Sequence, residues 1–144
     1  KNIDDRKNAI LNEHRTFSNW IKSILIQKYS NLVKEYYHSE REMTGEDEMD
    51  DELPADQNYP MSVLEMACGK GGDLRKWHEA KIQNSVGIDI SNVSLQRAAA
   101  RFMGFQGLSF CSLFIEGDGA TDPQEFFKDF QDDMYFDIVS CQMA

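Results

Sequence analysis

Hydrophobic side chains recur every three or four residues in the first part of the chain and occur in short runs after residue 60. In residues 16–37 the regularly spaced apolar positions are Phe17, Trp20, Ile21, Ile24, Leu25, Leu32 and Val33. This spacing places them on one stripe of a helix, so the pattern predicts a helix over residues 16–37, with weaker helical character before it.

After residue 60 the pattern alternates between short apolar runs and helix-like stretches. The runs predict strands at residues 61–67, 85–90, 108–116 and 136–141, and the stretches predict helices at 73–80, 92–103 and 123–130. Repeated strand–helix units with short connections imply a doubly wound, mostly parallel α/β sheet with helices on both faces. Such a sheet usually continues past a fourth strand, so we expect it to be incomplete at the C-terminus and the chain to be the N-terminal part of something larger.

Charge divides the chain further. Residues 39–58 hold nine acidic residues and one arginine, which is most of the excess acid in a chain of net charge −10. This segment is poor in apolar residues and carries Gly45 and Pro54, features typical of a solvated, disordered loop. We therefore expect an N-terminal helical segment (1–38), an acidic disordered loop (39–60) and the first strand–helix units of a core (61–144).

The composition excludes several classes of protein. The 144 residues are enough for one domain with a core, and no stretch approaches the roughly 20 apolar residues of a membrane span. The three cysteines form no CxxC pair, and their apolar or turn surroundings predict buried or half-buried reduced thiols in the cytosol or nucleus. The three histidines have no metal-ligand spacing, so we expect no metal site.

The turn after the first predicted strand, "VLEMACGKGGDLRKW" (63–77), is rich in glycine and leads into a helix. Glycines at such a turn let the backbone approach a ligand closely. The spacing is not the GxGxxG of dinucleotide folds, and Asp73 at the helix start would repel a pyrophosphate, although it could simply cap the helix. The turn thus favours a nucleoside cofactor without phosphates, such as S-adenosylmethionine.

Further acidic residues stand near the ends of the predicted strands. Asp89 ends the second strand in "SVGIDIS", and Asp118 follows the third in "FIEGDGA". An acid at the first position can accept hydrogen bonds from ribose hydroxyls, and one at the second can reach an adenine amine. Each alone could be an ordinary turn aspartate, but with Asp73 they form a series at successive turns of the carboxyl edge, which favours a binding site. Glu65, within the first strand, is costly to bury unless it orders the turn.

Three segments together resemble one family, the messenger-RNA cap guanine-N7 methyltransferases. "VLEMACGKGGDLRKW" is similar to its VLDLGCGKGGDLxKW motif, "RTFSNWIKSILI" (15–26) to its RxFNNWxKS segment, and "FDIVSCQMA" (136–144) to its FDxxSCQ strand. The matches occur in the same order and cover nearly the whole chain. The resemblance implies a Rossmann-like class I S-adenosylmethionine-dependent methyltransferase.

The resemblance also implies two sets of site residues. The positions expected to bind S-adenosylmethionine are Lys22, Ala67, Asp89, Asp118 and Gln142. The positions expected to contact the cap are Ser18, Asn19, Lys70, Lys76 and Arg101. This sequence departs from the family by having Ala67 for a glycine, Ser18 for an asparagine and Glu65 for an aspartate.

The implied activity is methyl transfer from S-adenosylmethionine to guanine N7 at the capped 5′ end of mRNA. Because N7 has a free lone pair and the sulfonium methyl is already activated, orientation suffices, and we expect no catalytic side chain. The implied setting is the nucleus, with other capping enzymes or the RNA polymerase II machinery as partners and no membrane. We expect residues 1–144 alone to be weakly active or inactive.

The residues leave two main alternatives open. One is a methyltransferase of the same fold that acts on a small molecule or a protein. The other is a non-catalytic interaction module that docks through its acidic segment. A dinucleotide oxidoreductase is a more distant possibility.

Overall fold

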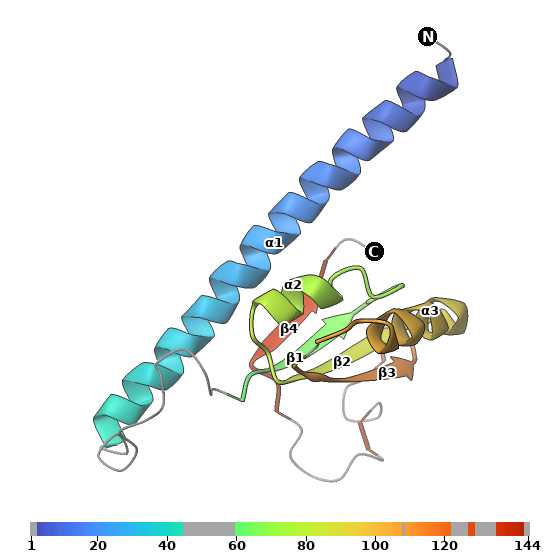
Figure 1. Ribbon diagram of the computed structural model, residues 1–144. Helices are drawn as coiled ribbons and strands as arrows, with labels where there is room; N and C mark the ends of the chain where they lie inside the picture. Colours follow the sequence, from blue (N-terminus) through green and yellow to red (C-terminus); the bar gives the residue numbers. More distant parts are fainter. Residues whose placement is uncertain (1–2, 45–59, 108, 122–126, 129–134, 143–144) are drawn as a thin grey trace.

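The computed structural model describes residues 3–44, 60–107, 109–121, 127–128 and 135–142, and it shows a long helix beside an α/β sheet (Figure 1). In chain order the elements are α1 (Ile3–Thr44), β1 (Ser62–Met66), α2 (Leu74–Glu79), β2 (Asn84–Asp89), α3 (Asn92–Met103), β3 (Cys111–Glu116) and β4 (Ile138–Cys141). The four predicted strands and the helices predicted at 73–80 and 92–103 are confirmed, with small shifts at their ends. The helix predicted at 123–130 lies almost entirely outside the described residues.

In the described part of the chain the sheet has four parallel strands, in the order β3-β2-β1-β4. The chain moves outward from β1 through β2 to β3 and then returns to the other side of β1 for β4. The strand order therefore reverses between β1 and β4. In open α/β sheets, ligands bind at the carboxyl edge beside such a reversal. The predicted mostly parallel, Rossmann-like sheet is confirmed.

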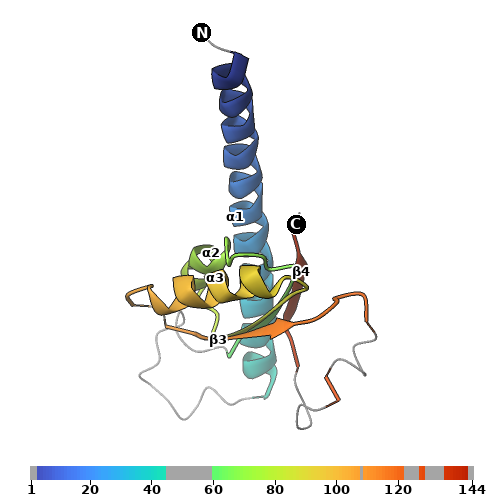
Figure 2. The ribbon, with the colours of Figure 1, turned by 90° about the vertical axis from the view of Figure 1, so that its right-hand side faces the viewer.

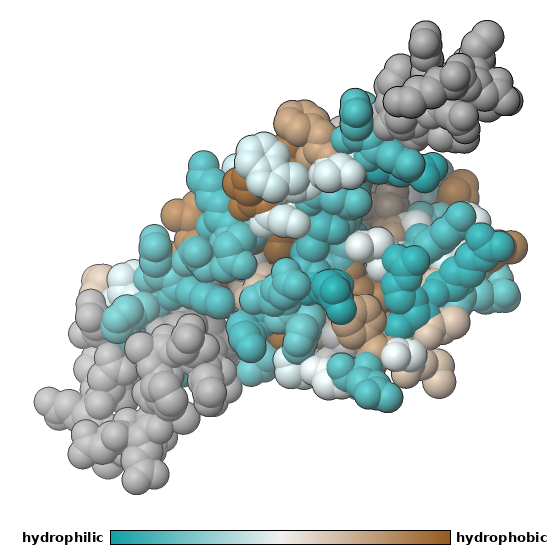
Figure 3. Space-filling model, turned by 45° about the horizontal axis from the view of Figure 1, so that its top comes forward, coloured by the Kyte–Doolittle hydropathy of each residue, from teal (hydrophilic) through white to brown (hydrophobic). Residues whose placement is uncertain are grey.

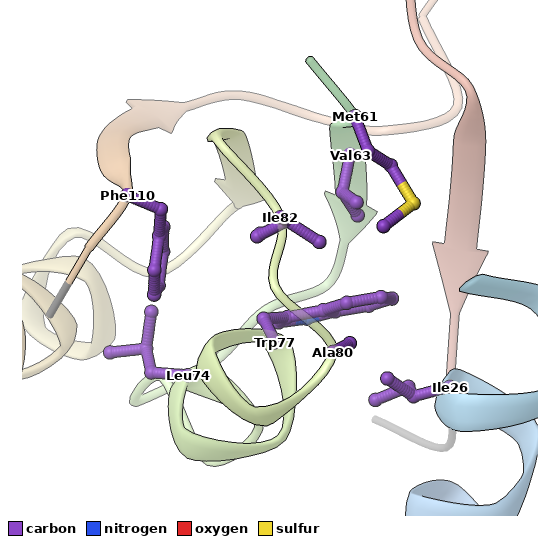
Figure 4. Packing of buried hydrophobic residues seen from close by; sticks show 8 residues of the cluster. All are labelled: Ile26, Met61, Val63, Leu74, Trp77, Ala80, Ile82 and Phe110. Atoms are coloured by element: carbon purple, nitrogen blue, oxygen red, sulfur yellow. The ribbon is translucent and has the colours of Figure 1, made fainter. Parts of the chain in front are cut away.

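Helices α2 and α3 lie over the same face of the sheet (Figure 2). Under them is a core of eight buried residues: Ile26, Met61, Val63, Leu74, Trp77, Ala80, Ile82 and Phe110. Figure 4 shows the Trp77 ring inside this cluster, with Ile82 and Val63 on one side and Ile26 of α1 approaching from another. Trp77 thus joins the sheet, α2 and α1 in one core.

The opposite face of the sheet carries a smaller cluster made by Leu64, Val86 and Ile88. Phe127 and Phe136 pack against it. The helices of the described residues therefore cover one face only. The expectation of helices on both faces concerns the segment 123–130, of which the structure describes only residues 127–128.

Helix α1 is longer than predicted, and a different face of it packs on the domain. Its least exposed positions include Lys22, Ile26, Ser30, Val33 and Tyr37, which follow a four-and-three spacing. The predicted apolar stripe is wrong as a buried face, because most of its members are exposed; Trp20, for example, is 59% accessible. The helix also continues through residues 39–44, which were predicted as loop. The rest of that acidic segment, residues 45–59, lies outside the described residues.

A hydrogen-bonded aspartate fastens α1 to the start of the sheet. The Tyr37 hydroxyl donates to Asp137 Oδ1, and the Ser62 backbone N–H donates to Asp137 Oδ2 at 2.7 Å. One carboxylate thereby connects α1, the start of β1 and the residue before β4. The N-terminal part of α1 projects beyond the sheet in both ribbon views (Figures 1 and 2).

Candidate functional site

The glycine turn between β1 and α2 runs along the carboxyl edge of the sheet. Its backbone is held by Cys68 N–H, which donates to Ile88 O at 3.0 Å, and by Gly71 N–H, which donates to Cys68 O at 3.1 Å. Gly71 has a φ of +66°, and an added Cβ would lie 2.8 Å from Leu74 Cδ1 and 3.2 Å from Ala98 Cβ. Glycine at this position therefore allows both the left-handed backbone and the close packing of the turn on α2 and α3.

Ala67 is one of the three departures from the motifs of the family that the sequence resembles, and its backbone conformation is one that favours glycine. Ala67 has a φ of +54°, in the left-handed region where a Cβ is strained. The position precedes Cys68, whose side chain occupies the space that a Cβ on Gly87 would fill, at 2.9 Å from Cys68 Sγ. The alanine is accommodated at a backbone cost, and its side chain is half-buried beside the turn.

Asp89 ends β2 and joins that strand to the glycine turn. Its Oδ2 accepts a hydrogen bond from Gly69 N–H and its Oδ1 accepts one from Ser91 N–H, each at 2.8 Å. The carboxylate is half-buried, so each oxygen retains lone-pair capacity toward the edge of the sheet. Asp89 ends its strand at the carboxyl edge of the sheet, as the sequence predicted, and the structure adds its contact with the glycine turn.

Asp118 lies in the turn after β3. Its Oδ1 accepts a hydrogen bond from Ala120 N–H at 2.9 Å, so it is an aspartate that also satisfies its own turn. A Cβ added at the next residue, Gly119, would lie 2.9 Å from Met66 Cε at the end of β1. The turn that carries Asp118 therefore packs over the end of the central strand, although Asp118 itself is exposed.

Gln142 follows β4, on the other side of the strand reversal. Its Nε2 donates to Ser140 Oγ at 3.0 Å, whereas its Oε1 is buried and has no hydrogen-bond partner among the described residues. A buried acceptor without a donor is unfavourable. A ligand that donates a hydrogen bond at this end of β4 would satisfy it.

The carboxylate of Asp73 contacts two lysines that come from different helices. Its Oδ2 lies 3.0 Å from Lys22 Nζ of α1, and its Oδ1 lies 2.6 Å from Lys76 Nζ of α2. Lys76 Nζ also donates to Asn19 Oδ1 at 3.4 Å. The expected helix cap is wrong, because the Asp73 side chain makes no capping hydrogen bond. From the sequence, the negative charge of Asp73 was expected to repel a pyrophosphate. Because two lysines balance that charge in the structure, the repulsion is weaker than expected.

The remaining predicted cap-contact residues lie on α1, in the glycine turn and on α3. Arg101 Nη1 of α3 donates to Gly71 O at 3.2 Å, so its guanidinium packs on the turn. Lys70 is exposed within the turn, and Ser18 is half-buried one helical turn before Lys22. The structure brings Asn19, Lys22 and Lys76 into one contact network and Arg101 to the turn. Figure 3 shows a face of the molecule on which hydrophilic side chains predominate.

Two buried titratable groups lie at the glycine turn, Glu65 in β1 and Cys68 in the turn itself. Glu65 is 8% exposed and accepts a hydrogen bond from Trp77 Nε1 at 3.3 Å. Burial, and then the charge of Asp73, raise the pKa of Glu65 to about 7. Burial, with the charges of Glu65 and Asp89, likewise raises the pKa of the Cys68 thiol to about 12. Cys111 and Cys141 are exposed free thiols, contrary to the expectation that all three cysteines are buried or half-buried.

A groove of about 730 Å³ lies beside the site, between α1 and β4. Apolar side chains of α1, such as Leu25, Tyr29 and Leu32, form one wall, and residues 137–142 with Trp77 line the rest. Among the described residues no cluster of histidine, cysteine and acidic side chains could hold a metal ion. None of the described helices combines the length and the apolar character that a membrane span requires.

The chain is similar to known proteins over most of its length. The mRNA cap guanine-N(7) methyltransferase of Schizosaccharomyces pombe is 37% identical over 131 residues, which are 90% of this chain and 29% of that protein. The mRNA cap guanine-N(7) methyltransferase 1 of Arabidopsis thaliana is 33% identical, with 99% of this chain and 32% of that protein covered. The chain thus spans about a third of the length of these relatives.

The sequence profile of the mRNA (guanine-N(7))-methyltransferase domain family matches residues 47–144. The Saccharomyces cerevisiae mRNA cap guanine-N(7) methyltransferase is 38% identical over 104 residues, which are 72% of this chain and 18% of that protein. The profile covers more than half of the chain and includes the glycine turn and all four strands. The chain therefore belongs to the mRNA (guanine-N(7))-methyltransferase domain family.

Proposed function

We propose that the protein containing this chain transfers a methyl group from S-adenosylmethionine to N7 of the guanine cap at the 5′ end of mRNA. The observation that carries the proposal is the contact of Lys22, Asp73 and Lys76 beside the glycine turn. Lys22 is expected to bind the cofactor and Lys76 is expected to contact the cap. Both lysines contact the carboxylate of Asp73, at the carboxyl edge of the sheet.

The residues at this edge fit the cofactor. The Gln142 Oε1 atom is a buried acceptor without a partner among the described residues, and Asp89 has acceptor capacity beyond its two backbone donors. Lys22 offers a positive charge for the carboxylate of S-adenosylmethionine. The exposed Asp118 can accept a hydrogen bond from the adenine amine of the same cofactor. When bound, S-adenosylmethionine supplies a methyl group activated by its sulfonium centre.

The remaining side chains suit a ligand with phosphates. Lys70, Lys76 and Arg101 are cations on the turn, α2 and α3, and such groups bind a phosphate bridge as point charges or forks. Asn19 Oδ1 of α1 accepts a hydrogen bond from Lys76 Nζ at 3.4 Å, and Ser18 is the preceding residue of the same helix; both side chains offer hydrogen bonds. In this proposal the residues bind and orient both ligands and exclude water, and none of them removes a proton, because guanine N7 already has a free lone pair.

The nuclear location and the contacts with other capping enzymes or with the RNA polymerase II machinery belong to the same proposal. They are supported by the family resemblance alone. The capped 5′ end of mRNA is the proposed substrate because of the same resemblance and because Lys70, Lys76 and Arg101 are cations that can bind phosphates.

The test is a methyl-transfer reaction with the full-length protein. Radiolabelled S-adenosylmethionine is supplied with RNA carrying an unmethylated guanine cap, and the same RNA with a bare 5′ triphosphate is the control. The proposal expects the label in 7-methylguanosine after nuclease digestion and none with the control RNA. Label on a small molecule or on protein, with the capped RNA unmodified, would favour the rival methyltransferase. Binding of partners without any transfer would favour an interaction module.

A further inference from the structure

Asp73 is buried between two helices that carry different parts of the site. Its side chain is 6% exposed, and the side chains of Lys22 and Lys76 are 19% and 13% exposed. A carboxylate so far removed from water is costly unless its charge is balanced. Here each carboxylate oxygen is engaged by a different ammonium group, which satisfies that requirement.

The two lysines come from separate elements. Lys22 lies on α1, 51 residues before Asp73 in the chain, whereas Lys76 is three residues after it on α2. A lysine side chain has four rotatable bonds and loses conformational entropy when its position is fixed. A shared buried carboxylate fixes both side chains before any ligand arrives.

The cluster keeps a positive charge that an anionic ligand can use. Asp73 supplies one negative charge for two ammonium groups. Glu65 lies below, but burial raises its pKa to about 7, so it adds only part of a second negative charge near neutral pH. The charges that face Asp73 are therefore those of Lys22, Lys76 and a partly ionised Glu65.

We propose that Asp73 is a positioning residue shared by the two ligand sites, which holds Lys22 toward the cofactor and Lys76 toward the cap. The inference rests on the proposed function, because that function assigns the two lysines to two ligands. It goes beyond that function by making one carboxylate responsible for the geometry of both sites.

Positioning and simple electrostatics predict opposite results when the Asp73 charge is removed. A carboxylate repels nearby anionic groups, here the carboxylate of S-adenosylhomocysteine and the phosphates of the cap dinucleotide, so without positioning Asp73→Asn would strengthen the binding of both ligands. If Asp73 positions the lysines, the substitution frees two mutually repelling ammonium groups, and both ligands bind more weakly.

The experiment is calorimetric titration of the full-length protein with S-adenosylhomocysteine and, separately, with a cap dinucleotide. Asp73→Asn is expected to weaken each ligand roughly tenfold, a size typical of coupled polar contacts. Lys22→Met is expected to weaken only S-adenosylhomocysteine, and Lys76→Met only the cap dinucleotide. Glu79→Gln, which removes the same charge from an exposed position on α2, is the matched control and should leave both affinities unchanged.

Double variants distinguish positioning from general damage to the fold. Asp73→Asn should have no further effect on S-adenosylhomocysteine in the Lys22→Met background, nor on the cap dinucleotide in the Lys76→Met background. Effects that persist in those backgrounds, or affinities that rise, would overturn the inference.

Two other outcomes are also decisive. If Asp73→Asn does not fold, as judged by circular dichroism, Asp73→Glu replaces it; this variant keeps the charge but shifts it by one methylene, and unchanged affinities for both ligands would overturn the inference. If the wild-type protein binds neither ligand, the proposed function itself fails, and the inference fails with it.

Discussion

The backbone N–H of Gly69 donates a hydrogen bond of 2.8 Å to the carboxylate of Asp89, which lies 20 residues further along the chain. The second oxygen of the same carboxylate accepts from Ser91 N–H. One side chain thus fixes the glycine turn after β1 to the start of α3, and these are the segments that border the proposed cofactor position.

Asp89→Asn should loosen the glycine turn, because an amide offers one acceptor oxygen where the carboxylate offers two. We expect the free energy of unfolding to fall by about 1–2 kcal/mol and the rise in melting temperature caused by S-adenosylhomocysteine to disappear. Urea and thermal denaturation measure both. Glu116→Gln, at the register partner of Asp89 on β3, is the control and should keep the ligand-induced rise.

Gly71→Ala should destabilise the protein, whereas Gly72→Ala should not. At Gly71 a Cβ meets Leu74 Cδ1 at 2.8 Å on a backbone with positive φ, while a Cβ at Gly72 meets nothing within 4 Å. We expect Gly71→Ala to cost about 2 kcal/mol or more from strain and overpacking. Equal unfolding midpoints in urea for the two variants would contradict the described turn.

Glu65 should make the protein less stable as the pH rises. Its pKa is about 7 in the folded state, above the ordinary 4.5, so between those values the folded state holds a proton that the unfolded state has lost. The free energy of unfolding should therefore fall from pH 4.5 to pH 7 by roughly 3 kcal/mol from this group, and the loss persists above pH 7.

Glu65→Gln is the matched variant, because glutamine keeps an acceptor for Trp77 Nε1 but does not ionise. Urea denaturation at pH 5 and pH 8 should show a smaller difference in stability for the variant than for the wild type. The same difference in both proteins would show that Glu65 is not the titrating group.

Tyr37→Phe should weaken the attachment of α1 to the sheet. The Tyr37 hydroxyl donates to Asp137, which also anchors the start of β1. We expect a loss of about 1 kcal/mol in the free energy of unfolding. Tyr36→Phe removes a hydroxyl bonded to the exposed Glu40 on the same helix and should change stability less. A larger effect for Tyr36→Phe would reverse the assigned roles.

The strands and the acidic strand ends could be predicted from the sequence, because both depend on local patterns. Apolar runs bounded by turn residues mark β1 to β4, and an acid directly after a parallel strand lies at the carboxyl edge wherever the strand pairs. Asp89 was found in this way. The family motif added Lys22 and Gln142, which no local pattern marks as binding residues.

The face of α1 and the role of Asp73 could not be predicted, because both are tertiary. The apolar spacing from Phe17 to Val33 predicts a buried stripe, but the domain instead covers the face that contains Lys22, Ile26 and Ser30. Asp73 stands where a helix cap is common, and only the folded chain brings Lys22 to it from 51 residues away. Glutamates at residues 39–44 suggested a loop, although glutamate also favours helix.

The central claim is that the carboxyl edge binds a nucleoside cofactor through the glycine turn and a cap through nearby cations. Calorimetric titration of the full-length protein with S-adenosylhomocysteine, with a cap dinucleotide and with NAD tests this claim most directly. We predict that S-adenosylhomocysteine and the cap dinucleotide each bind, that neither displaces the other, and that NAD releases no heat of binding. Binding of NAD in place of S-adenosylhomocysteine, or direct competition between S-adenosylhomocysteine and the cap dinucleotide, would contradict the claim.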